Sequence, residues 1–189
     1  MKKQLAVFAS GTGTNFDAIA RACADGVLDA EVAVMVCDKP GAAVIEKAAR
    51  YGVETFVFSP KSYPCKAAFE AEIVKILDAK KIDLVCLAGY MRIVGETLLN
   101  AYEGKIINIH PALLPAFKGA HAVEDAVAYG VKVYGITIHW VNADLDGGKI
   151  IAQRAFPYEG SDPAEVHAIG QIIEHELYVQ TINQLLCAR

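Results

Sequence analysis

The chain has 189 residues, of which 54% are hydrophobic and 21% charged, and its formal net charge is -4. This length suits one domain with a sizeable core, and the composition is ordinary for a soluble globular protein. An acidic chain lacks the clustered Lys and Arg that grip phosphate backbones, which excludes nucleic acid as the main partner.

The five cysteines are scattered and form no Cys-x-x-Cys pair, so we predict reduced thiols and neither disulfides nor a zinc site. Lys2 and Lys3 precede an apolar run of only about five residues, which is too short for a signal peptide. No apolar stretch approaches the roughly 20 residues of a membrane helix. These features predict a cytoplasmic protein with no membrane partner.

The first predicted strand covers residues 5–9, and a glycine-rich turn at 10–15 joins it to an Ala-rich helix at 16–22. Such a turn exposes backbone N–H groups where the helix dipole favours an anion, and we expect a phosphate there. The dinucleotide fingerprint Gly-x-Gly-x-x-Gly fits only in part, because Phe16 replaces its third glycine. Asp38, however, follows the next strand at the distance of a ribose-binding acid, so a nicotinamide enzyme is a second interpretation.

Strands and helices alternate along the rest of the chain. The predicted strands are residues 31–37, 53–58, 82–88, 106–109, 132–141 and 148–156, and the predicted helices are residues 41–50, 64–80, 122–129 and 163–186. In the helix at 64–80 the spacing of apolar side chains predicts that Phe69 and Ile73 face the core while Glu70 points elsewhere. Repeated strand–helix–strand units predict an α/β fold with a doubly wound, mostly parallel sheet and helices on both faces.

The strand at 106–109 runs into Pro111 and Pro115, which cannot continue it. Asn108 and His110 therefore lie at the carboxyl end of a strand and, two residues apart, point to the same side. Ligands bind in the crevice outside such strand ends, where an Asn and a His can polarise a carbonyl group. A turn histidine satisfied by backbone groups explains the pattern alone equally well.

An acidic, glycine-rich loop at residues 142–148 connects the last two predicted strands. Its simplest interpretation is a solvated hairpin. If these strands join the sheet beside Asn108, one carboxylate of the loop can reach His110 and raise its pKa. Asp146 is the preferred candidate because glycines adjoin it, but spacing alone does not separate it from Asp144.

A His, an amide and a carboxylate together suit acyl transfer to an amine, since the attack creates an oxyanion and a surplus proton. No protein nucleophile is needed when the substrate brings its own amine, and the sequence has no common signature of one. We expect His139, on the strand at 132–141, to contact these residues without touching the substrate itself. His121, His167 and His175 lack metal-ligand spacing, so no metal is predicted.

Four ordered motifs resemble those of the phosphoribosylglycinamide (GAR) formyltransferase family. They are GTGTN at residues 11–15, LAGYMRI at 87–93, NIHPALLP at 108–115 and LDGGKIIAQ at 145–153. The match spans almost the whole chain, and the motifs are specific only as a set. The resemblance implies one Rossmann-like formyltransferase domain at 1–189, with a phosphate-binding half at about 1–100 and a catalytic, folate-binding half at about 101–189.

The resemblance implies that 10-formyltetrahydrofolate gives its formyl group directly to the glycyl amine of GAR in purine synthesis. It assigns His110 as general acid, Asn108 as oxyanion donor and Asp146 as the residue that keeps the pKa of His110 high. These two small molecules would be the only partners of a monomer or homodimer.

The resemblance also assigns binding residues to both substrates. The residues for GAR are Gly13, Thr14 and Asn15 at the phosphate and Glu174 at the ribose. The residues for the folate are Met91, Arg92, Ile93 and Val94, largely through their backbone, with Asn108 and, near the far end, Lys66.

Two positions depart from the family pattern: Lys118 stands where proline is common, and Tyr90 where phenylalanine is frequent. They concern loop rigidity and pocket lining. The alternative function is that of a formyltetrahydrofolate deformylase catalytic domain, which is a hydrolase. That family has two consecutive histidines at the position where this chain has His110 and Pro111. Methionyl-tRNA formyltransferase, which adds a tRNA-binding domain, and a non-enzymatic ligand-binding module are more distant alternatives.

Overall fold

The computed structural model describes residues 2–187 and is built on a seven-stranded sheet with the order β3-β2-β1-β4-β5-β6-β7. The strands are β1 (Lys3–Phe8), β2 (Ala30–Cys37), β3 (Thr55–Val57), β4 (Leu84–Leu87), β5 (Ile106–His110), β6 (Val133–Trp140) and β7 (Ile150–Pro157). The pairs among β1 to β5 are parallel, whereas β6 is antiparallel to both β5 and β7. The predicted mostly parallel sheet is confirmed.

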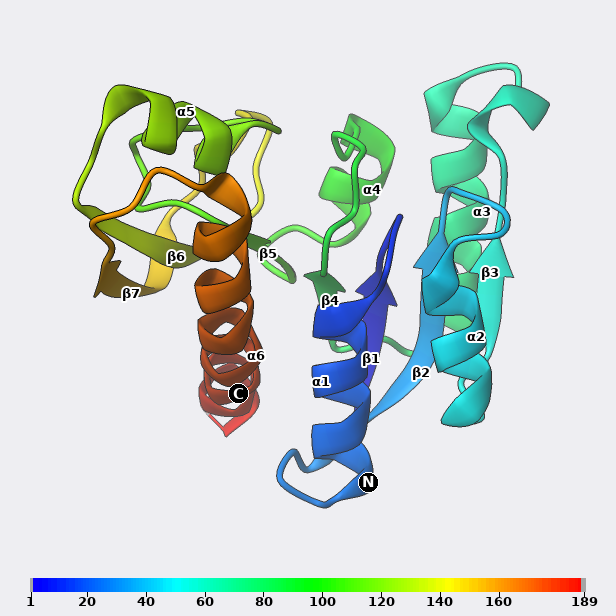
Figure 1. The fold of residues 1–189 in the computed structure, drawn as a ribbon. Helices are drawn as coiled ribbons and strands as arrows, with labels where there is room; N and C mark the ends of the chain where they lie inside the picture. The colour runs from blue at the N-terminus through cyan, green and yellow to red at the C-terminus, as the bar shows by residue number, and fades with distance from the viewer. Residues whose placement is uncertain (1, 188–189) are drawn as a thin grey trace.

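Helices cover both faces of the sheet, as predicted (Figure 1). They are α1 (Thr14–Ala24), α2 (Ala43–Arg50), α3 (Lys66–Ala79), α4 (Glu96–Ala101), α5 (Ala122–Tyr129) and α6 (Pro163–Cys187), with a short 3-10 helix η1 (Pro60–Ser62). One buried cluster joins α1, α2 and α6 to the sheet through Phe16, Val44 and Tyr178. A second cluster on the other face contains Ile73 of α3 and Leu98 of α4.

The prediction that Glu70 points away from the core is wrong. This side chain on α3 is only 3% exposed, and its carboxylate accepts hydrogen bonds from the backbone N–H groups of Gly95 at 2.6 Å and Leu98 at 3.4 Å. The first N–H groups of a helix lack partners within it, and a carboxylate is favoured there by the helix dipole. Glu70 thus caps α4, a helix too short to show a helical period in the sequence.

The register of the last strands brings distant polar residues together. Asn108 pairs with His139 across β5 and β6, and Asn108 is also level with Leu87, the last residue of β4. The loop between β6 and β7 is a hairpin connection, as its sequence suggests, and it places Asp146 beside Asn108 of β5. No helix within residues 2–187 is long and apolar enough to cross a membrane.

Candidate active site

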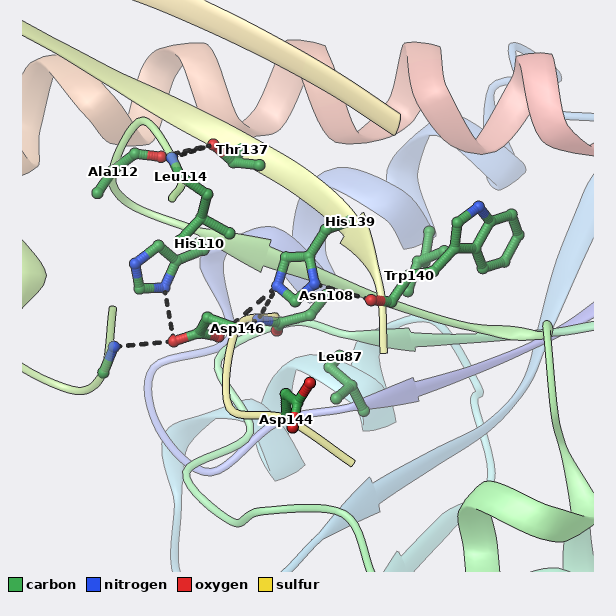
Figure 2. Close-up of polar contacts among 12 residues, drawn as sticks. Leu87, Asn108, His110, Ala112, Leu114, Thr137, His139, Trp140, Asp144 and Asp146 are labelled. Atoms are coloured by element: carbon green, nitrogen blue, oxygen red, sulfur yellow. Dashed lines mark hydrogen bonds and ion pairs between the residues drawn. The ribbon is translucent and has the colours of Figure 1, made fainter. Parts of the chain in front are cut away.

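The carboxylate of Asp146 is the meeting point of the predicted catalytic residues (Figure 2). Its Oδ2 atom accepts a hydrogen bond from the backbone N–H of Gly119 at 2.8 Å and lies 3.5 Å from Nδ1 of His110. Its Oδ1 atom lies 3.5 Å from Nδ2 of Asn108 and 3.6 Å from Nε2 of His139. A carboxylate surrounded by four nitrogen atoms is well placed to stay charged although it is largely buried.

The electrostatics of Asp146 follow from these contacts. Hydrogen bonding with His139 lowers the pKa of Asp146 to about 2, with further help from the Gly119 N–H and the charges of His110 and His139, against the opposing effect of burial. Asp144 is exposed, and Figure 2 shows it apart from this cluster. Of the two candidate acids in this loop, Asp146 is therefore the one that lies beside His110.

His110 lies between two hydrogen-bond acceptors. Its Nε2 atom is 2.8 Å from the backbone oxygen of Phe117, while Nδ1 faces Asp146. A neutral imidazole has only one N–H, so a doubly protonated ring is the form that satisfies both neighbours. The backbone partner expected of a turn histidine and the carboxylate expected of a catalytic one are both present.

His139 lies behind Asn108 and is 2% exposed. Its Nδ1 atom donates a hydrogen bond to the backbone oxygen of Trp140 at 2.9 Å. Its Nε2 atom lies 3.2 Å from Nδ2 of Asn108 and 3.6 Å from Oδ1 of Asp146. Nδ2 of Asn108 therefore faces both His139 and Oδ1 of Asp146.

Three groups that support the site were not found from the sequence. The Phe117 carbonyl and the Gly119 N–H belong to the backbone and have no side-chain signal. Thr137 is fully buried, donates a hydrogen bond to the Ala112 carbonyl at 2.6 Å and accepts one from the Leu114 N–H at 3.1 Å. The alternation of β6 marks Thr137 as an inward position, but it does not show that the hydroxyl shapes the turn after His110.

A cavity of about 340 Å³ opens beside this cluster. Asn108, His110 and Asp146 line it, together with the backbone segment Met91, Arg92, Ile93 and Val94. The predicted folate residues and catalytic residues therefore share one cavity. Lys66 is outside its lining and donates a hydrogen bond to the Ile93 carbonyl at 3.0 Å.

The predicted GAR residues gather where β1 meets α1. Gly13 has a φ of 68°, and a Cβ there would fall 2.4 Å from Cγ2 of Val44, so only glycine fits. Nδ2 of Asn15 donates a hydrogen bond to Glu174 of α6 at 2.7 Å. The Oδ1 atom of Asn15 is buried and has no hydrogen-bond partner within the part of the chain that the structure describes. Thr14 accepts a hydrogen bond from Gln171 at 3.1 Å.

Glu174 is a mostly buried carboxyl group. Burial raises its pKa, and the hydrogen bond from Asn15 opposes that rise. Glu174 and Pro111 both border a small recess, and Pro111 also lines the main cavity. The glycine-rich turn at residues 10–15 and the cluster around Asp146 are therefore neighbours in the structure. Residues 2–187 contain no group of three or more His, Cys, Asp and Glu side chains that could hold a metal ion.

A histidine, an amide and a largely buried carboxylate beside a cavity form a set of groups that suits acyl transfer. Comparison with known proteins shows which family of acyl-transfer enzymes the chain belongs to. Residues 3–182 match the family described as formyl transferase. The chain is 50% identical to the phosphoribosylglycinamide formyltransferase of Bacillus subtilis over 185 residues, which is 97% of this chain and 95% of the relative.

Solved structures agree with this assignment. The glycinamide ribonucleotide transformylase 1 of Geobacillus kaustophilus has 53% identity and a TM-score of 0.95, with 98% of this chain and all of that chain covered. The phosphoribosylglycinamide formyltransferase of Bacillus halodurans has 50% identity and a TM-score of 0.94, with 97% and 95% covered. The chain therefore belongs to the formyl transferase family and, within it, to the phosphoribosylglycinamide formyltransferases. The predicted family, the fold and the transferase activity are confirmed.

The low pKa of Asp146 predicts an acid-dependent loss of stability. The folded-state value of about 2 lies below the ordinary value of 3.8, so the charged form stabilises the fold by about 2 kcal/mol above pH 3.8, and this contribution disappears as the pH falls toward 2. Urea unfolding of the wild type and of Asp146→Asn at a series of pH values should show the difference between them shrink across this window. Asp144→Asn, at an exposed site, is the control. A difference that does not change with pH would contradict this role of the charge.

Proposed function

We propose that the chain transfers the formyl group of 10-formyltetrahydrofolate to the glycyl amine of GAR in purine biosynthesis. The observation that carries the proposal is the Asp146 carboxylate 3.5 Å from Nδ1 of His110, beside a cavity that Asn108 also lines. The family membership supports a formyl donor, and the folate is our choice of that donor. A cytoplasmic location stays a prediction.

In the proposed reaction the amine of GAR attacks the formyl carbon and forms a tetrahedral intermediate with a negatively charged oxygen. Asn108, which lines the cavity, donates a hydrogen bond to this oxygen from its side-chain amide. The bond from the formyl carbon to N10 of the folate then breaks, N10 takes up one proton, and the attacking amine loses one. The overall change is formyl-GAR and tetrahydrofolate, with no net proton.

His110 is the proposed general acid. Its Nε2 proton is held by the Phe117 carbonyl at 2.8 Å, whereas the Nδ1 contact with Asp146 is longer, at 3.5 Å. The Nδ1 proton is therefore the one that is available to the reacting atoms. The carboxylate of Asp146 stabilises the positive ring electrostatically and keeps the proton in place until the intermediate forms.

The two substrates would approach from opposite sides of the catalytic cluster. The folate would lie against the backbone of Met91, Arg92, Ile93 and Val94 and contact Asn108, with Lys66 near its far end. GAR would place its phosphate on the turn of Gly13, Thr14 and Asn15 and its ribose at Glu174, where the unpartnered Oδ1 of Asn15 is a ready acceptor. We also propose a phosphate-binding half at about 1–100 and a catalytic half at about 101–189, with sites that draw residues from both.

Replacing catalytic groups should lower turnover without unfolding the protein. We expect His110→Ala and Asp146→Asn each to reduce kcat by about 100-fold or more, the range of a lost general acid or of the group that orients it. Steady-state assays with GAR and 10-formyltetrahydrofolate measure this, with Asp144→Asn as the matched control from the same loop. A folded Asp146→Asn enzyme with near-normal kcat would remove Asp146 from the mechanism.

The phosphate turn predicts a strong dependence of binding on the substrate's 5′-phosphate. A GAR analogue without this group should bind at least about 100-fold more weakly, because it loses several charge-assisted N–H contacts at the start of α1. Calorimetry measures both ligands, and the affinity for the folate serves as the internal control because it should not change. Equal affinity for the two GAR forms would assign the turn a purely structural role.

A further inference from the structure

Ser10 connects the glycine-rich turn to the proposed folate segment. Its backbone N–H donates a hydrogen bond to the Gly89 carbonyl at 3.0 Å, and its hydroxyl oxygen accepts one from the Met91 N–H at 2.9 Å. The hydroxyl group donates its own proton to Oδ1 of Asp38. Ser10 is only 6% exposed, so these three hydrogen bonds are buried.

Asp38 completes this connection from β2. Its side chain is 7% exposed, with Oδ1 bound to the Ser10 hydroxyl and Oδ2 bound to Nε of Arg92 at 2.7 Å. The sequence singled out this acid as a candidate ribose ligand of a nicotinamide cofactor; the chain is instead a formyl transferase, and in the structure the acid binds Ser10 and Arg92. One buried carboxylate thus holds Ser10 and Arg92 together, and through Ser10 it holds Met91.

The rest of the folate segment depends on similar polar contacts. At its far end, Lys66 binds the Ile93 carbonyl and Glu70 binds the Gly95 N–H. Between these two anchors the side chains of Met91 and Ile93 are largely exposed and add little packing. The backbone that lines the cavity is therefore kept in shape by buried carboxylates at each end, and the loss of one costs more than an ordinary surface contact.

We propose that Asp38 is a positioning residue for the folate, which acts through Ser10 and Arg92 to hold residues 89–93 in the shape that binds the formyl donor. This inference rests on the proposed function of that segment. The phosphate turn has a separate support, because the Val44 N–H binds the Gly11 carbonyl at 3.1 Å. Asp38 should therefore affect the folate and leave GAR binding and the chemical step unchanged.

The test compares Asp38→Ala with Asp83→Ala. Asp83 is a control carboxylate at the opposite end of the sheet; it is 34% exposed, accepts the Gln4 N–H at 2.8 Å and pairs with Lys3 at 3.5 Å. We expect Asp38→Ala to raise both KM and the calorimetric Kd for 10-formyltetrahydrofolate by about tenfold, with kcat and the KM for GAR within about twofold of the wild type. Asp83→Ala should change none of these constants.

Asp38→Asn is a milder variant for use if the alanine protein does not fold, because its side-chain oxygen still accepts the Ser10 proton. It should weaken folate binding by about threefold through loss of the charged pair with Arg92. Folate binding as tight as that of the wild type in a folded Asp38 variant overturns the inference alone, and so does an equal loss in Asp83→Ala. A wild-type protein that binds no folate overturns the proposed function and this inference with it.

Discussion

The fixed position of the Asp146 carboxylate is the constraint on which the active site depends. Asn108 and His110 come from β5, His139 comes from β6, and Gly119 comes from the loop between them, yet all four direct a nitrogen atom at this one group. A buried carboxylate is costly unless such donors surround it, so these segments stabilise one another's positions. The same carboxylate lies 3.5 Å from Nδ1 of the proposed general acid, His110.

Helix α6 links the proposed GAR site to the catalytic strands. Glu174 holds Asn15 of α1, and one turn later the fully buried hydroxyl of Tyr178 donates to the Leu87 carbonyl at 2.9 Å, with the Ile107 carbonyl at 3.3 Å. Leu87 is the last residue of β4, four positions before Met91, and Ile107 of β5 directly precedes Asn108. In the proposed reaction such a link would hold the amine of GAR at a constant distance from the formyl carbon and so raise its effective concentration.

Much of this architecture could be predicted from local patterns. The apolar strands, the Gly13 turn and the position of His110 before proline each follow from residues close in the chain, and the helix at 122–129 was predicted with the bounds it has. Contacts between distant segments escaped prediction. Glu70 looked like a solvent-facing helix residue because its partners lie about 25 positions away, at Gly95 and Leu98. Asp144 and Asp146 could be separated only by the fold of their loop, and the Phe117 carbonyl carries no signal in any side chain.

Transfer and hydrolysis of the formyl group pass through the same kind of oxyanion, so the decisive difference is whether an amine or a water molecule attacks. The most direct measurement follows formate, formyl-GAR and tetrahydrofolate together after 10-formyltetrahydrofolate is mixed with the enzyme, first without and then with GAR. Our account predicts slow formate release without GAR and, on its addition, a rise in tetrahydrofolate by orders of magnitude that is matched by an equal amount of formyl-GAR. Rapid formate release that does not depend on GAR would contradict it and favour the deformylase.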